Sequence, residues 1–206
     1  MTKLCFVDVE TTGTDPRLNG IIQIAGMTCT LNDGKLEEGE SFNLRVRPHL
    51  ADTIEDAALE VNGVTREMLA GEEYRDPKEV HRWLEKIFGR HVDKFDRADK
   101  FFFVGYNARF DYDFLRAFFE KCGDKYFGSF FHFPPVDVMN MAVVHLLGQR
   151  IKMPNFKLAT VAAQLGIEPG GDLHDALVDI KLTQKIFAML WEQQTKEKRY
   201  EAPVAG

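Results

Sequence analysis

The order of strand-like and helical segments is the feature of this sequence that most constrains its fold. Three segments rich in β-branched, aromatic and other apolar residues come first, separated by turn residues, at 3–10, 21–32 and 39–47. A buried-strand pattern at 101–105 runs directly into a helical one. Amphipathic or capped helices are predicted at about 76–90, 109–122, 137–148, 157–165 and 174–193. Strands followed by strand–helix units predict the α/β class, with a mixed central sheet that begins as an antiparallel meander.

Length, charge and cysteine usage narrow the class of protein further. A chain of 206 residues suits one compact domain and is short for two. The net charge of −6 argues against a protein that coats nucleic acid with a basic face, although carboxylates that hold cations count as negative in this sum. Cys5, Cys29 and Cys122 are odd in number and form no C-x-x-C pair, and no segment approaches the roughly 18 apolar residues of a membrane span. We therefore expect a cytoplasmic protein with no membrane association.

The first group of residues suited to chemistry lies at the end of the first strand. Side chains alternate across a strand, so Asp8 and Glu10 point to the same face as Leu4 and Phe6. Their α-carbons would be roughly 6.6 Å apart, which lets both carboxylates reach one cation. A D-x-E pair alone is equally well explained by a strand end that meets solvent.

The second group is in the segment GYNARFDYDFL, where Asp111 follows the carboxyl end of a strand and enters the first turn of a helix. An acid in that position also stabilises the helix macrodipole, by about 0.3–1 kcal/mol, and needs no catalytic role to explain it. Asp113 is a second acid on the same helix. The residues alone therefore leave a structural interpretation open.

The third group is the segment HDALVDI. Five residues correspond to about 500° of helical rotation, so His174 and Asp179 would not share a face of a regular helix, and we expect His174 on the loop side. The preceding Gly170 and Gly171 would let this histidine approach when substrate and metal are in place. Asp175 is an alternative ligand on spacing alone, and His174 can also be interpreted as a surface loop residue.

Taken together, the three segments resemble the three motifs of the DEDDh (DnaQ-like) exonucleases. FVDVETTG is similar to D-x-E-T-T-G, NARFDYDFL to N-x-x-F-D-x-x-F-L, and HDALVD to H-x-A-x-x-D, in the same order. The segments IIQIAG, LEVNGVT and NFKLATVAAQLGI are similar to supporting elements of that family, so the resemblance covers about residues 3–193. One motif is weak support, whereas three in order are strong.

This resemblance implies a ribonuclease H-like fold, with a mixed five-stranded sheet flanked by helices, in one exonuclease domain over residues 1–193. From its composition and terminal position we expect 194–206 to be a disordered tail. The resemblance also implies a 3'→5' exonuclease that releases 5'-mononucleotides by a two-metal mechanism. Two divalent cations, Mg²⁺ or Mn²⁺, would be held by carboxylates, with His174 as general base, and the motif register excludes Asp113 and Asp175. The implied metal ligands are Asp8, Glu10, Asp111 and Asp179.

Substrate contacts are predicted from the same motifs and from a basic cluster that precedes the third one. Asn107 could instead cap its helix, and the basic residues could form a solvated loop. The aromatic run from Phe127 to Phe133 could stack on bases, but we interpret it as core packing or a partner surface. The predicted substrate-binding residues are Thr11, Thr12, Gly13, Asn107, Phe110, Arg150, Lys152 and Lys157.

The expected partner is DNA or RNA with a free 3' end, and the sequence leaves a homodimer or an association with a polymerase open. Two other functions compete with the exonuclease. One is a catalytically silent nucleic-acid-binding or polymerase-accessory module, which the complete set of acids disfavours. The other is a ribonuclease H-like endonuclease, which a circular substrate would distinguish.

Overall fold

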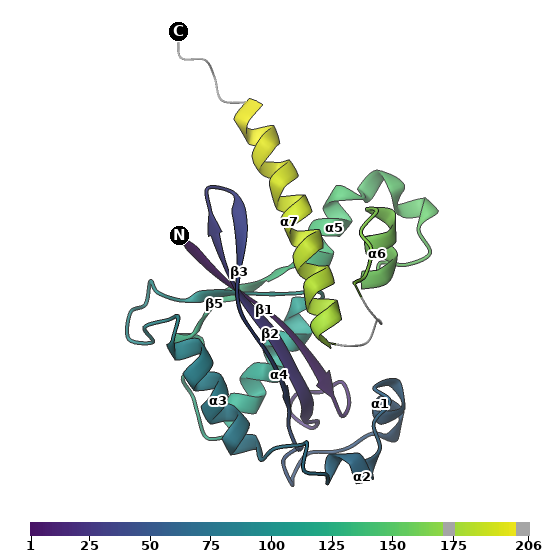
Figure 1. Cartoon of the computed structure of the whole chain (residues 1–206). Helices are drawn as coiled ribbons and strands as arrows, with labels where there is room; N and C mark the ends of the chain where they lie inside the picture. Colours follow the sequence, from purple (N-terminus) through teal and green to yellow (C-terminus); the bar gives the residue numbers. More distant parts are fainter. Residues whose placement is uncertain (171–175, 201–206) are drawn as a thin grey trace.

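A mixed five-stranded sheet forms the centre of the computed structural model, which describes residues 1–170 and 176–200, with side chains up to residue 195 (Figure 1). The strand order is β3-β2-β1-β4-β5. The strands are β1 (Thr2–Thr11), β2 (Ile21–Asn32), β3 (Lys35–Arg45), β4 (Phe101–Gly105) and β5 (Phe131–Asp137).

The first three strands form the predicted antiparallel meander. β1 pairs with β2 from Thr2 to Thr11, and β2 turns into β3 through Asp33 and Gly34, both of which have positive φ. This is the turn that an Asp-Gly pair favours. β4 and β5 are then added parallel to β1, so the prediction of a mixed five-stranded sheet is confirmed.

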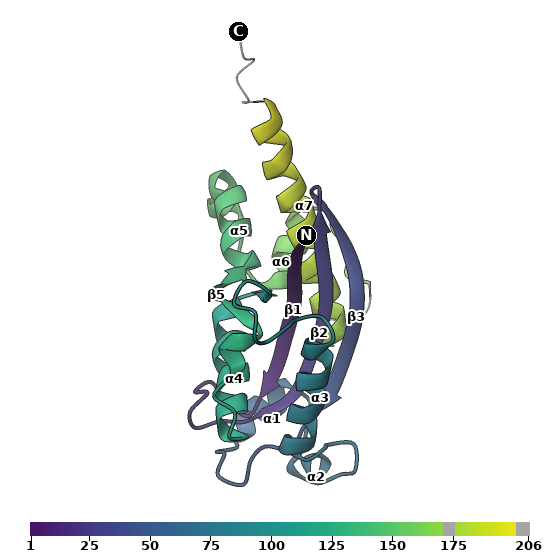
Figure 2. The same cartoon turned by 90° about the vertical axis from the view of Figure 1, so that its left-hand side faces the viewer.

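Helices cover both faces of the sheet (Figures 1 and 2). The alternation along β1 decides which residues meet which layer: Cys5, Val7 and Val9 pack with α3 and α4, whereas Leu4 and Phe6 pack with α5, α6 and α7. The helices are α1 (Asp56–Val61), α2 (Arg66–Leu69), α3 (Pro77–Gly89), α4 (Ala108–Lys121), α5 (Val138–His145), α6 (Leu158–Gln164) and α7 (Ala176–Tyr200).

Two short helices form a smaller unit at one end of the sheet, where α1 and α2 lie together below the strands in both views (Figures 1 and 2). Leu59 and Leu69 of these helices pack with Ile22 of β2 and with Tyr74. This unit lies at the end of the sheet where β1 ends, and is therefore close to the acidic end of that strand.

One strand and the end of the last helix differ from the sequence predictions. β5 was not located in the sequence, because Pro134 and Pro135 interrupt its strand pattern, yet proline is tolerated in this edge strand. α7 continues to Tyr200 instead of ending at about 193, since Glu, Gln, Lys and Arg are good helix formers. The rest of the predicted tail, 201–206, lies outside the described residues.

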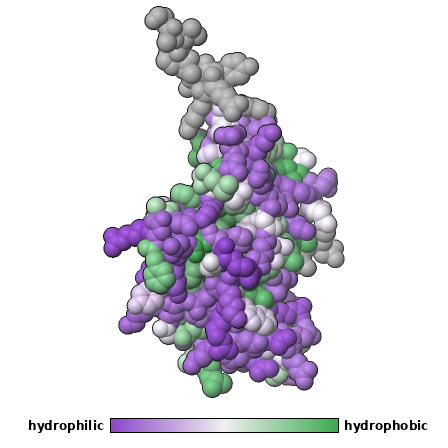
Figure 3. Space-filling model, turned by 60° about the vertical axis from the view of Figure 1, so that its left-hand side comes forward, coloured by the Kyte–Doolittle hydropathy of each residue, from purple (hydrophilic) through white to green (hydrophobic). Residues whose placement is uncertain are grey.

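The surface of the described part is mainly hydrophilic on the face shown in Figure 3, with apolar patches between the polar side chains. Within the described ranges, no helix combines the length and the apolar character that crossing a membrane would require.

Candidate active site

The carboxyl end of β1 carries the first two acids of the site. Asp8 and Glu10 are both half-buried, and lie on the face of the sheet that α7 covers. The strand that holds them is fixed by its neighbours, because β1 lies between β2 and β4. Because the two acids are two residues apart on a central strand, both carboxyl groups project from the same face of a rigid element.

Asp111 reaches this strand end from the start of α4. Its side chain is buried, at 3% exposure, and its Oδ1 accepts a hydrogen bond of 3.1 Å from the backbone N–H of Val9. Gly105 permits this close approach, since a Cβ there would lie 3.2 Å from the Val7 carbonyl oxygen and 3.2 Å from the Ala108 Cα. The second motif is thus attached directly to the first.

Asp179 completes the group from the first turn of α7. It is half-buried, and its charge raises the pKa of both Asp8 and Glu10. Acids from β1, α4 and α7, far apart in the sequence, are therefore electrostatically coupled at one place. Figure 1 shows the tip of β1 beside the lower end of α7.

Burial and mutual repulsion make these acids harder to ionise. Burial raises the pKa of Asp8 well above its usual range, and the carboxyls of Asp111, Glu10 and Asp179 raise it further. Burial, with Asp179, raises the pKa of Glu10 to about 7. Burial also raises the pKa of Asp111 to about 8, against the opposing effect of the Val9 N–H. A bound cation would relieve this cost by pairing with the carboxylates.

The chemistry of the donor set fits hard divalent cations. An all-oxygen carboxylate group suits Mg²⁺ or Mn²⁺. No three of these acids bring ligand atoms within 4.8 Å of one another; among the described residues, only His81, Glu85 and Asp124 form such a group. Two ions about 3.5–4 Å apart have separate sets of ligands, so their ligands are spread more widely than those of a single ion. The spacing of these acids is consistent with such an arrangement.

Of the remaining members of the predicted set, His174 lies outside the described residues, as does the alternative ligand Asp175. Asp113 is placed away from the group: it forms an ion pair of 2.6 Å with Arg109, one helical turn earlier. This ion pair gives Asp113 a structural role, and its exclusion from the metal site stays a prediction.

The three predicted substrate residues that follow β1 have internal structural roles. The Thr11 hydroxyl donates to the Gly13 carbonyl at 2.7 Å, and the Thr12 hydroxyl donates to the Thr53 carbonyl at 2.7 Å. Both threonines are buried, and a Cβ at Gly13 would lie within 2.4 Å of Asn19 atoms. Their side chains build the turn, which leaves substrate contact at this turn a prediction.

Asn107 does not cap α4 as expected. It occupies the N-cap position with a left-handed backbone, φ 64°, and its side chain makes no capping hydrogen bond. Its exposed amide is therefore not used in capping the helix. The capping interpretation was wrong because asparagine tolerates the left-handed region, a second reason for its presence at a turn.

The other predicted contacts are Phe110 and three basic residues. Phe110 is half-buried and packs on Phe114 at 4.7 Å between ring centroids. The three basic residues are exposed: Arg150 and Lys152 in a 3-10 helix, and Lys157 at the start of α6. Arg150 also lies over the ring of Phe156, so part of its side chain is held in place.

Asp137 is a residue near the site that the sequence analysis missed. It accepts hydrogen bonds from Met139 N–H at 2.9 Å and Asn107 N–H at 3.2 Å, so one carboxylate fixes both α5 and the left-handed turn. It also contributes to raising the pKa of Asp111. An acid at the start of a predicted helix was the available signal, since Asp is a favoured N-cap.

Carboxylates that gather at the end of a central strand of a mixed sheet are typical of hydrolases that use divalent cations. The comparison with family models then gives the particular group. The chain belongs to the exonuclease family whose model is named for RNase T, which matches residues 5–187. The predicted DEDDh (DnaQ-like) membership is thereby confirmed.

The relatives found by sequence include both a small ribonuclease and a domain of a larger polymerase. Ribonuclease T of Photorhabdus laumondii is 28% identical over 192 residues, which cover 91% of this chain and 84% of that protein. The PolC-type DNA polymerase III of Thermotoga petrophila is 27% identical over 190 residues, 92% of this chain but only 12% of the polymerase.

Solved structures confirm the fold. Exonuclease I of E. coli in complex with a dT13 oligonucleotide is similar with a TM-score of 0.74 at 21% identity, over 97% of this chain. Exonuclease I from Methylocaldum szegediense gives 0.74 at 24% identity. This chain spans less than half of either protein, 43% and 42%.

Proposed function

We propose that this protein is a hydrolytic 3'→5' exonuclease that removes 5'-mononucleotides from the 3' end of DNA or RNA. The observation that carries the proposal is the convergence of Asp8, Glu10, Asp111 and Asp179 within a domain of the exonuclease family. The complete acid set is also the reason for preferring an enzyme over a silent binding module.

We assign two divalent cations, Mg²⁺ or Mn²⁺, to these carboxylates. Asp8, Glu10, Asp111 and Asp179 would hold these ions, and the charges of the last three already act on the Asp8 carboxyl. Bound cations would activate the attacking water and stabilise negative charge on the leaving oxygen.

Other residues of the chain would hold the metal-binding carboxylates in position. The Val9 N–H fixes the Asp111 carboxylate, and Gly105 keeps α4 close to β1. His174, which lies outside the described residues, is assigned by its motif as the acceptor of the water's proton. A neutral imidazole suits this transfer, since an unperturbed histidine has a pKa near 6.5.

A small cleft of about 70 Å³ lies beside Glu10 and would contact only part of a terminal nucleotide. It lies between β2 and the unit formed by α1 and α2, and combines apolar walls with the amides of Gln23 and Asn62. The Asn62 amide donates to the Thr11 carbonyl at 2.9 Å, which joins this wall to the end of β1. The residues that line it are Glu10, Ile22, Gln23, Val61, Asn62, Val64 and Tyr74.

Strand-end labelling tests the proposal. With Mg²⁺, a 3'-labelled oligonucleotide should release its label at once as a mononucleotide, while a 5'-labelled one should shorten stepwise. DNA and RNA, single-stranded and paired, should be compared in parallel. Cleavage of a covalently closed single-stranded circle would instead indicate the endonuclease, and no cleavage of any strand with Mg²⁺ or Mn²⁺ would indicate the silent module.

A further inference from the structure

A second group of metal-ligating side chains lies on the opposite face of the sheet from the acidic centre. His81, Glu85 and Asp124 each offer one ligand atom, and these atoms all lie within 4.8 Å of one another. α3, which carries two of them, packs on the face of Cys5 and Val7, away from the face of the catalytic acids. The exonuclease chemistry proposed above does not use this group.

His81 and Glu85 are one helical turn apart on α3, a spacing that places both on one face of the helix. His81 is 8% exposed, and its ring lies edge-on to Phe119 of α4, with centroids 4.6 Å apart. Packing therefore fixes the orientation of the imidazole. Its Nδ1 lies 3.7 Å from a Glu85 oxygen.

Asp124 comes from the segment that follows α4. Gly123, with φ 91°, ends the helix and turns the chain toward α3. One oxygen of Asp124 accepts the Tyr126 N–H at 2.6 Å, and the other lies 3.1 Å from His81 Nε2. The side chain is only 12% exposed, so this oxygen is held facing the imidazole.

We propose that His81, Glu85 and Asp124 bind a borderline-soft divalent cation such as Zn²⁺ or Co²⁺, which links α3 to the end of α4. One imidazole nitrogen and two carboxylate oxygens are ligands that suit zinc, with water as the fourth ligand. Nε2 of His81 and Oδ2 of Asp124 are 3.1 Å apart, a separation that two ligands of one ion can share. Glu85 faces Nδ1 at 3.7 Å and would turn toward Nε2 to complete the site. Mg²⁺ is disfavoured here because of the imidazole, unlike at the all-oxygen centre.

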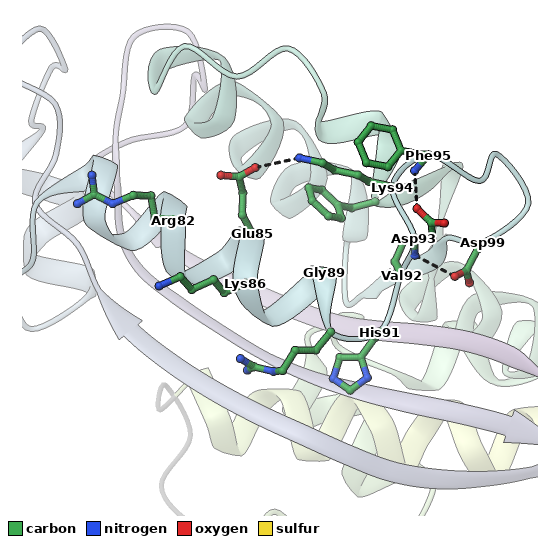
Figure 4. A pocket seen from close by; sticks show the side chains of 12 residues that line it. Arg82, Glu85, Lys86, Gly89, His91, Val92, Asp93, Lys94, Phe95 and Asp99 are labelled. Carbon is green, nitrogen blue, oxygen red and sulfur yellow. Dashed lines mark hydrogen bonds and ion pairs between the residues drawn. The ribbon is translucent and has the colours of Figure 1, made fainter.

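Glu85 provides the accessible side of this site. Its side chain is 32% exposed and extends toward Lys94, 3.7 Å away, at the edge of a surface pocket of about 680 Å³ (Figure 4). Lys94 must release Glu85 when the ion binds. An exposed pair of this kind is weak, so this competition is small compared with the binding of a transition metal.

Cobalt titration tests the proposal in a protein whose acidic centre has lost two of its four carboxylates. In an Asp8→Asn, Glu10→Gln background, one equivalent of Co²⁺ should give visible d–d absorption and raise the melting temperature. Glu85→Gln and Asp124→Asn should each weaken this binding roughly tenfold or more. Glu79→Gln is the matched control, because Glu79 is on α3 and similarly exposed, 34% against 32%.

Each outcome is decisive. If Co²⁺ and Zn²⁺ do not bind the background protein, the three residues are only an ion-paired link between helices and the proposal is wrong. It is also wrong if Glu79→Gln weakens binding as much as Glu85→Gln does. Because Glu85 is partly exposed, its variant should fold even if Asp124→Asn does not. Failure here would leave nuclease activity in the parent protein unaffected, so the two proposals fail separately.

Discussion

Replacing Asp111 by Asn should stabilise the metal-free protein while removing its activity. The pKa of Asp111 is raised from 3.8 to about 8, so at pH 7 the folded protein keeps a proton that the unfolded chain has lost. The difference between pH 7 and 3.8 is 3.2 units, which corresponds to about 4 kcal/mol at 1.4 kcal/mol per unit. Asn avoids this cost, and its oxygen can still accept the Val9 N–H.

The sign of this effect fixes its pH dependence. A raised pKa means that stability is fully present below the ordinary pKa and is lost as pH rises toward about 8. The advantage of Asp111→Asn over the parent should therefore grow from about 1 kcal/mol at pH 4.5 to about 4 kcal/mol at pH 7. The larger value is an upper limit, because Glu10 and Asp8 titrate together with Asp111.

Urea unfolding in EDTA at these two pH values measures the difference. Asp113→Asn is the matched control, since Asp113 is on the same helix, is half-buried and is paired with Arg109. It should change stability by no more than about 1 kcal/mol at either pH. A lower stability of Asp111→Asn than of the parent at pH 7, or an equal effect at both pH values, would contradict the raised pKa of Asp111.

Four further outcomes follow from the structure. Mg²⁺ at 100 times its Kd should stabilise the parent by about 2.7 kcal/mol in thermal melts, and should not stabilise Asp8→Asn. Gly105→Ala should cost about 1–3 kcal/mol in urea unfolding and also lower kcat, because its Cβ would lie 3.2 Å from the Val7 carbonyl oxygen; equal stability would show that the backbone there relaxes freely. Lys121→Met should lower the free energy of unfolding by about 3–5 kcal/mol, because it leaves the buried Asp52 carboxylate without its 2.6 Å ion pair. A second change, Asp52→Asn, should recover part of this loss. His174→Ala should slow cleavage without removing the thermal stabilisation by Mg²⁺; loss of both would point to a metal ligand instead of a base.

The main features of the fold were predictable because they depend on local patterns. Alternation along 3–10 correctly divided β1 into a face for α3 and α4 and a face that carries the acids. The Asp-Gly turn between β2 and β3 was visible in the same way. These features need only the periodicity of side chains and the preference of particular residues for positive φ.

Features that depend on contacts distant in the sequence were not predictable. β5 is a strand because an edge beside β4 accepts prolines, which a local pattern counts against it. The role of Asp137 depends on the turn at Asn107 that it fixes, thirty residues earlier. The spacing of His81 and Glu85 was visible, but only the fold places Asp124 beside them.

The acids of the site were likewise predictable only in part from local patterns. Asp8 and Glu10 could be placed on one face from the strand period alone, whereas Asp111 and Asp179 joined them only through family motifs. The structure supplies the physical connection, in which Val9 N–H binds Asp111 and the charge of Asp179 acts on Asp8.

The most direct test of the central claim is the rate of Mg²⁺-dependent mononucleotide release by Asp8→Asn compared with Asp113→Asn. Asp8 interacts with the other three acids, whereas Asp113 is paired with Arg109 outside the group. Asp8→Asn should reduce the rate by on the order of 100-fold or more, and Asp113→Asn should retain the rate of the parent protein. Equal rates for the two variants would contradict the assignment of the acidic centre.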